Sequence, residues 1–182
     1  MAGPTTDFWQ ERFEKKQTGW DRGAASPQLL AWLDSEALKP CRIAVPGCGS
    51  GWEVAELARQ GFDVVGIDYT PAAVERTRAL LSAQGLMAEV LRADVLAYQP
   101  DKPFDAIYEQ TCLCALHPDH WVEYARQLQK WLPGQYLGTV HADDSTGSDR
   151  RGAHSGAALS LRHQRHAGAL SCARLGVAQA AL

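Results

Sequence analysis

The chain has 182 residues, 46% of them hydrophobic, and a net charge of −3, which suits one domain with a hydrophobic core. This charge gives no reason to expect nucleic acid or an anionic membrane as a partner. Because no apolar run approaches the roughly 20 residues of a membrane span, no secretory signal is visible, and the five cysteines lack a disulfide-scaffold spacing, we expect a cytoplasmic protein.

The first part of the chain is an aromatic segment. Asp7 is expected to cap a short helix, and a loop centred on a tryptophan follows that helix. The aromatic residues of this segment are Phe8, Trp9, Phe13 and Trp20. On pattern alone they fit core packing as well as contact with a ligand. Ser26 and Pro27 then give a second helix start, since a capping side chain before a proline is typical of one.

A glycine-rich loop follows the first predicted strand, residues 41–45. The loop has glycines at Gly47, Gly49 and Gly51, and a helical pattern begins at Trp52. Glycines let the chain turn sharply and let a ligand approach bare backbone. The N-terminus of the following helix offers free N–H groups and a positive dipole end. The sequence therefore predicts a nucleotide-like cofactor site here.

The spacing of these glycines bears on which cofactor is bound. The dinucleotide fingerprint of dehydrogenases needs a third glycine at its sixth position, where this chain has the bulky Trp52. The pattern G-x-G-x-G instead resembles the first motif of S-adenosylmethionine (SAM) methyltransferases. Asp68 ends the second predicted strand, 17 residues after Gly51, where a carboxylate meets ribose hydroxyls. An acid there also serves dehydrogenases, so it supports a nucleotide site without choosing the cofactor.

Strands and helices alternate along the chain as far as residue 140. Further strands are predicted at residues 88–91, 104–108 and 135–140, and the intervening helices begin at Trp52, Thr70 and Pro118. This alternation predicts an α/β fold of the Rossmann-like type, a parallel sheet with helices on both faces. Ligands in such sheets bind at the carboxyl ends of the strands. The groups expected to converge there are the glycine loop, Asp68, Asp94, Glu109 and Gln110.

Residues 141–182 differ in composition from the rest of the chain. They contain no Trp, Phe, Tyr, Ile, Lys, Glu or Pro, and a helix over residues 157–169 would have only a thin apolar face. Such a segment is poor material for a core. We therefore expect a domain at residues 1–140 whose C-terminal part is incomplete, followed by a poorly ordered tail at 141–182. Our hypothesis is that a frameshift near codon 134 produced this tail.

Taken together, these motifs resemble the thiopurine S-methyltransferase-like family of SAM-dependent methyltransferases, over roughly residues 7–140. Four segments carry the resemblance: Phe-Trp-Gln-Glu-Arg-Phe at 8–13 with Thr-Gly-Trp at 18–20, Val-Pro-Gly-Cys-Gly-Ser-Gly at 45–51, Val-Val-Gly-Ile-Asp at 64–68, and Phe-Asp-Ala-Ile-Tyr-Glu-Gln-Thr-Cys-Leu-Cys-Ala-Leu at 104–116. The first and last segments are more specific than a glycine loop alone. The resemblance implies SAM as the cofactor.

The resemblance also implies roles for the aromatic and glycine residues. Trp9, Phe13 and Trp20 match the N-terminal aromatic segment that closes over SAM in the family. Phe13 replaces the more usual tryptophan and keeps an aromatic face. Gly47 and Gly49 match the loop beside the methionine portion of the cofactor.

Three polar residues complete the cofactor site that the resemblance implies. Asp68 matches the ribose-binding acid, and Asp94 matches an acid near the adenine. Gln110 matches a cofactor-contacting position after the fourth strand, where thiopurine enzymes proper usually have arginine. The chain therefore resembles the thiol and halide branch of the family more closely.

The cysteine and histidine residues around the fourth of these segments do not indicate a metal centre. Cys112 and Cys114 lie two residues apart without further ligands at zinc-like spacing. His117 and His120 lack an accompanying H-E-x-x-H pattern. We expect structural roles for the two cysteines and no metal binding by the two histidines.

The resemblance implies methyl transfer to a small soft nucleophile such as a thiol. We also expect a monomer with no nucleic acid or membrane partner. We assign no catalytic base, because a thiol is already partly ionised near neutral pH. The family's C-terminal strands and substrate-side residues have no match here. The alternative is a catalytically impaired SAM-fold protein that serves as a binding or interaction module. An NAD-type dehydrogenase is disfavoured by Trp52.

Overall fold

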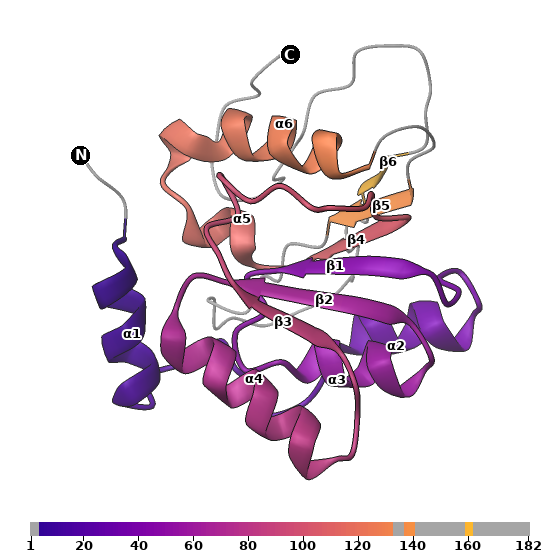
Figure 1. Ribbon diagram of the computed structural model, residues 1–182, viewed down its shortest axis with the longest axis horizontal. Coiled ribbons are helices and arrows are strands. Elements are labelled where there is room, and N and C mark those ends of the chain that lie inside the picture. The colour runs from indigo at the N-terminus through magenta and orange to yellow at the C-terminus, as the bar shows by residue number, and fades with distance from the viewer. Residues whose placement is uncertain (1–3, 133–136, 141–158, 162–182) are drawn as a thin grey trace, which may run out of the picture.

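The structure is a computed structural model that describes residues 4–132, 137–140 and 159–161 (Figure 1). One sheet contains all of its strands, in the order β3-β2-β1-β4-β5-β6. The strands are β1 Arg42–Pro46, β2 Asp63–Asp68, β3 Glu89–Arg92, β4 Ala106–Glu109, β5 Leu137–Val140 and β6 Leu159–Leu161. Strands β1 to β5 pair in parallel and β6 pairs antiparallel with β5. The predicted parallel α/β sheet is confirmed.

The helices form two layers around this sheet (Figure 1). Their bounds are α1 Thr6–Glu14, α2 Pro27–Asp34, α3 Trp52–Arg59, α4 Pro71–Ala83, α5 Cys112–Ala115 and α6 Trp121–Trp131, with a short 3₁₀ helix η1 at Pro118–His120. Helices α2, α3 and α4 cover one face, and α5 and α6 cover the other (Figure 1). None of these helices is long and apolar enough to cross a membrane.

Alternating side chains of the central strands fill two hydrophobic cores. In β1, Ile43 and Val45 face the core under α2, α3 and α4, whereas Ala44 between them faces the core under α6. Tyr124 and Trp131 of α6 are fully buried in that second core. Burial on both faces explains why the central strands read as continuous apolar runs rather than as alternating ones.

One local expectation is wrong, and a helix weighed for the tail is a strand in part. The cap of α1 is Thr5, whose side-chain oxygen accepts a hydrogen bond from the N–H of Phe8 at 3.3 Å, and Asp7 lies inside the first turn of the helix. In the C-terminal tail, residues 159–161 form strand β6 where a helix over 157–169 was considered. Pairing with the edge of the sheet at β5 outweighs the weak helical pattern of that stretch. The other residues of the expected tail lie outside the described residues.

Helix α1 stands beside the N-terminal half of α4, at one end of the sheet (Figure 1). The side-chain oxygen of Gln10 accepts a hydrogen bond from the N–H of Ala72 at 3.0 Å, in the first turn of α4. The Arg76 guanidinium donates a hydrogen bond to the carbonyl of Phe13. It also lies over the Phe13 ring, 5.2 Å from the ring centroid, within the roughly 6 Å of a cation–π contact. These contacts bring the aromatic segment to the carboxyl ends of β1 and β2.

Candidate cofactor-binding site

The glycine loop turns by backbone conformations that disfavour side chains. Gly47, Gly49 and Gly51 have φ values of +60°, +55° and +82°. A Cβ atom on Gly47 would lie 2.8 Å from Cys112 Cβ, and one on Gly51 would lie 2.6 Å from Thr77 Cγ2. The loop therefore needs glycine at these positions both for its shape and for its packing against α5 and α4.

Helix α3 begins directly after this loop with no side-chain cap on its N-terminus. Gly51 is the N-cap residue and has a left-handed conformation, and the first N–H groups of a helix have no partner inside it. Such N–H groups and the positive end of the helix dipole favour electron-rich ligand atoms. This local arrangement matches the sequence prediction.

Asp68 lies at the end of β2 and fastens the glycine loop. It is only 8% exposed. Its Oδ2 atom accepts a hydrogen bond from Gly49 N–H at 3.1 Å, and its Oδ1 atom accepts one from Thr70 N–H at 2.9 Å. Burial raises the pKa of Asp68 above its ordinary value, although these N–H donors act in the opposite direction. Since a carboxylate has about four acceptor positions, Asp68 can still accept hydroxyl hydrogen bonds.

The three predicted aromatic residues form one cluster beside the glycine loop. Trp9 and Trp20 meet edge to face with centroids 5.5 Å apart, and Phe13 and Trp20 do so at 6.1 Å. The tip of the Phe13 ring is 3.8 Å from the position that a Cβ on Gly49 would occupy. Phe13 is buried, whereas Trp20 is 36% exposed. The structure thus brings the three aromatic residues together next to the loop.

Asp94 and Gln110 flank the loop on opposite sides. The N–H of Ala93 donates to the carbonyl of Asp68 at 3.0 Å, which places the exposed Asp94 beside the end of β2. Its Oδ1 atom accepts a hydrogen bond from Leu96 N–H at 2.9 Å. On the other side, the Oε1 atom of Gln110 accepts a hydrogen bond from the Tyr108 hydroxyl at 3.1 Å.

A pocket joins several of the predicted residues. Trp20, Gly47 and Gln110 line it, together with Asp21 and Trp52. The other predicted residues, Trp9, Phe13, Gly49, Asp68 and Asp94, do not line it. These residues come from the aromatic segment, the glycine loop, the start of α3 and the end of β4. Residues far apart in the sequence therefore share one hollow at the carboxyl ends of the strands.

Sequence reasoning missed the part of Asp21 and left the part of Glu109 open. Asp21 accepts hydrogen bonds from the side chains of Ser50 and Trp52, which the spacing of the motifs does not reveal. The sequence placed Glu109 among the groups at the carboxyl ends of the strands without giving it a role. It is only 2% exposed and accepts a hydrogen bond from the Tyr124 hydroxyl. Burial raises the pKa of Glu109 to about 7, although the Tyr124 hydroxyl acts against this rise.

Tyr69 is a further residue of this edge that the sequence did not single out. Its pKa is raised to about 12, first by burial and then by the charges of Asp68 and Asp94. That electrostatic link indicates that the ends of β2 and β3 face one environment. The only sequence signal for Tyr69 is its place directly after Asp68.

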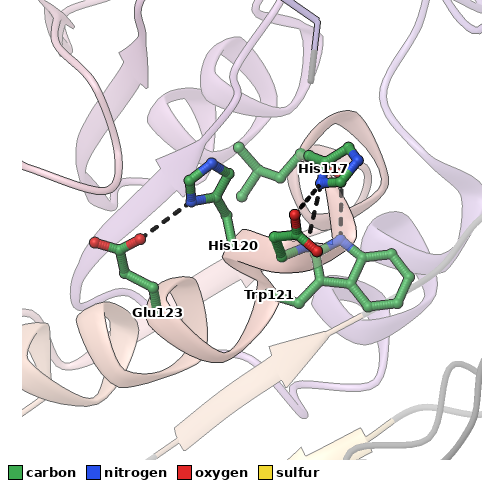
Figure 2. Close-up of polar contacts among 6 residues, drawn as sticks. His117, His120, Trp121 and Glu123 are labelled. Carbon is green, nitrogen blue, oxygen red and sulfur yellow. Dashed lines mark hydrogen bonds and ion pairs between the residues drawn. The ribbon is translucent and has the colours of Figure 1, made fainter. Parts of the chain in front are cut away.

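The histidines near η1 interact with acids of their own turn. Nδ1 of His117 lies 3.2 Å from Asp119 Oδ2, and Nδ1 of His120 lies 3.2 Å from Glu123 Oε2 (Figure 2). Among the residues that the structure describes, no group of three or more His, Cys, Asp or Glu side chains could hold a metal ion. Within that part of the chain, these pairs act as local contacts of the η1 turn.

The parallel sheet and the glycine loop after β1 are those of the Rossmann-like methyltransferase fold. A solved methyltransferase from Burkholderia thailandensis, with S-adenosylhomocysteine and 1,6-didemethyltoxoflavin bound, superposes with a TM-score of 0.62. That match covers 80% of this chain and 67% of the other, at 21% sequence identity. At that identity the likeness establishes the fold alone.

The chain belongs to the Thiopurine S-methyltransferase (TPMT) family, whose pattern it matches over residues 4–152. It is 32% identical to the probable thiol methyltransferase 2 of Arabidopsis thaliana, over 77% of this chain and 63% of that protein. It is 30% identical to the thiopurine S-methyltransferase of Pseudomonas putida, over 73% and 69%. The family predicted from the motifs is confirmed, and the match runs past the domain boundary expected at residue 140. The chain spans about three fifths of the length of the Arabidopsis relative.

Proposed function

We propose that this chain binds SAM and transfers its methyl group to a small soft nucleophile such as a thiol. One observation carries the proposal: Trp20, Gly47 and Gln110, from three separate segments, line one pocket at the carboxyl ends of the strands. Cofactors of open α/β sheets bind in that place. The names of the relatives, a probable thiol methyltransferase and a thiopurine S-methyltransferase, support a sulfur acceptor.

The residues present fit a nucleoside cofactor. Gly47 and Gly49 expose backbone with no Cβ, so an elongated ligand can lie against the loop. Asp68, held by two N–H donors, keeps acceptor positions for the two ribose hydroxyls. Asp94 is exposed beside the end of β2, and the family resemblance assigns it to the adenine side of the ligand.

The aromatic cluster suits the positive charge of a sulfonium cofactor. SAM supplies an electrophilic methyl group, so the protein contributes position and electrostatics. An aromatic face near the sulfonium contributes about 0.5–2 kcal/mol, and Trp20 lines the pocket where such a contact would form. A thiol acceptor needs little help from a base because it ionises near neutral pH. We therefore assign the chain the tasks of binding and orienting both molecules.

Calorimetric titration with S-adenosylhomocysteine tests the cofactor part of the proposal. We expect micromolar binding in the wild type and at least tenfold weaker binding in Asp68→Ala, since ribose hydrogen bonds to a charged group are lost. Asp63→Ala is the matched control because Asp63 lies at the other end of the same strand. Equal weakening in both variants, or no binding by the folded wild type, would contradict the proposal.

A second candidate function is that of a SAM-fold binding module without turnover. The observation that favours it is that residues 141–182 lack the aromatic, strand-patterned sequence of the rest of the chain. Transfer of labelled methyl from SAM to a panel of small thiols separates the two candidates. Turnover supports the enzyme, whereas tight S-adenosylhomocysteine binding without turnover supports the module.

Three further expectations stay predictions. Translating the gene in its other two frames tests the frameshift hypothesis, and a frame rich in aromatic, strand-patterned sequence after codon 134 would support it. Cell fractionation tests the cytoplasmic location. Sedimentation tests the monomeric state.

A further inference from the structure

Asp21 connects the aromatic segment to the glycine loop. Its carboxylate accepts hydrogen bonds from the Ser50 hydroxyl and from the Trp52 indole N–H, the latter at 2.8 Å. The N–H of Gly23 donates to the same carboxylate at 2.9 Å and fixes its orientation. The donors Ser50 and Trp52 lie 29 and 31 residues further along the chain. One side chain thus bridges two segments that surround the pocket.

The charge of Asp21 is well supported at this position. Burial alone would raise its pKa, but the hydrogen bonds from Ser50, Gly23 and Trp52 together bring the pKa below its ordinary value. The carboxylate is therefore ionised at neutral pH. Hydrogen bonds to an ionised acceptor are stronger than those between neutral groups.

Trp52 gains a specific part in this arrangement. It occupies the position where the dinucleotide fingerprint has glycine, and its indole nitrogen is the donor that Asp21 engages. Trp20 is the chain neighbour of Asp21 and contacts both Trp9 and Phe13 edge to face. The hydrogen bonds that hold Asp21 therefore also hold the aromatic cluster beside the glycine loop.

We propose that Asp21 is a positioning residue, a latch whose carboxylate fastens the aromatic segment to Ser50 and Trp52 and so closes that segment over the cofactor pocket. This inference rests on the proposed function, because a closed segment matters only if the pocket holds a cofactor. The latch acts through Trp20 and its aromatic partners rather than on the methyl group that is transferred. Both Asp21 and Trp52 line the same pocket, at the place where the two segments meet.

Two variants test the latch with little change of shape. Asp21→Asn replaces one acceptor oxygen by a donor, and Trp52→Phe removes the indole N–H but keeps an aromatic ring. We expect each to weaken S-adenosylhomocysteine binding about tenfold in calorimetry. The double variant should bind no more than about twofold more weakly than the single variant that binds more weakly. Asp21→Asn removes the charge and Trp52→Phe removes the donor, so both changes act on the same contact. Asp34→Asn, an exposed acid at the end of α2, is the control.

Limited proteolysis measures closure of the aromatic segment separately from the overall stability of the protein. Lys15 and Lys16 are exposed after the end of α1, within the aromatic segment and between Phe13 and Trp20. We expect S-adenosylhomocysteine to slow trypsin cleavage there in the wild type but not in Asp21→Asn. The melting temperature of the two proteins without ligand should agree within about 3 °C, which corresponds to less than about 1 kcal/mol.

The outcomes separate this inference from the proposed function. If the wild type binds and Asp21→Asn binds equally well with the same protection, the latch is wrong and the cofactor site stands. If both single effects simply add in the double variant, Asp21 and Trp52 do not act together and the latch is again wrong. If the folded wild type does not bind, both ideas are overturned.

Discussion

Two turns reach the same edge of the sheet and are held in different ways. The turn between β1 and α3 is held by backbone shape, with left-handed glycines packed against Cys112 and Thr77. The turn between β4 and α5 is held by a buried carboxyl, Glu109, bonded to the Tyr124 hydroxyl of α6. The two turns touch where Gly47 meets Cys112. We therefore expect added side-chain atoms to destabilise the first turn, and loss of a hydrogen bond to destabilise the second.

The largest expected effect is on the glycine turn. Gly51→Ala places a left-handed alanine with its Cβ 2.6 Å from Thr77 Cγ2. Left-handed strain and overpacking together should lower the free energy of unfolding by about 3 kcal/mol, measured by urea denaturation. Gly61→Ala is the matched control, because Gly61 also has a positive φ of +85° but has nothing within 4 Å of its Cβ position. A loss of about 1 kcal/mol is expected there, and equal losses would show that packing plays no part.

The pH dependence of stability should reveal Glu109. Its pKa is about 7 in the folded protein against 4.5 ordinarily, so the folded state keeps a proton that the unfolded state has lost. Stability from this group is fully present below pH 4.5 and is lost as pH rises through 7, by on the order of 3 kcal/mol. Urea denaturation between pH 5 and 8 measures it. Glu109→Gln should remove most of the slope in this window, and an unchanged slope would assign it to other groups.

The smallest effects compare one hydrogen bond from each turn. Tyr124→Phe at pH 8 removes a donor to an ionised, buried Glu109 and should cost about 2 kcal/mol. Thr77→Val keeps the shape of the side chain and removes a bond of 3.0 Å from its hydroxyl to the Gly49 carbonyl. About 1 kcal/mol is expected for that neutral bond. A larger cost for Thr77→Val would mean that side-chain bonds, rather than backbone shape, hold the glycine turn.

The fold was predictable because its signals are local. Glycine and proline mark the ends of the elements, and the strands alternate with helices at ordinary spacing. The end of β4 was harder, since nothing in residues 109–116 distinguishes the four-residue helix α5 from a loop. The N-cap of α1 was misplaced by two residues because threonine and aspartate are both good capping residues. The part of the tail that pairs as β6 gave no strand signal of its own.

The residues of the candidate site also divide into those that local sequence signals predict and those that they do not. Most of its predicted residues lie in loops at strand ends, and the topology of a parallel sheet alone brings them together. Asp21 could not be foreseen, because its partners are side chains 29 and 31 residues away. The burial of Glu109 also depends on where α6 packs, which sequence spacing does not specify.

The sequence by itself determined the parallel sheet, the glycine turn, the acid at the end of β2 and the family to which the chain belongs. These follow from backbone preferences and periodicity, which act between residues close together in the chain. Only the tertiary structure decided that Asp21 bridges to Trp52 and that Glu109 keeps a raised pKa beside Tyr124. Hydrogen bonds and desolvation depend on which distant side chains share a small volume, and folding settles that.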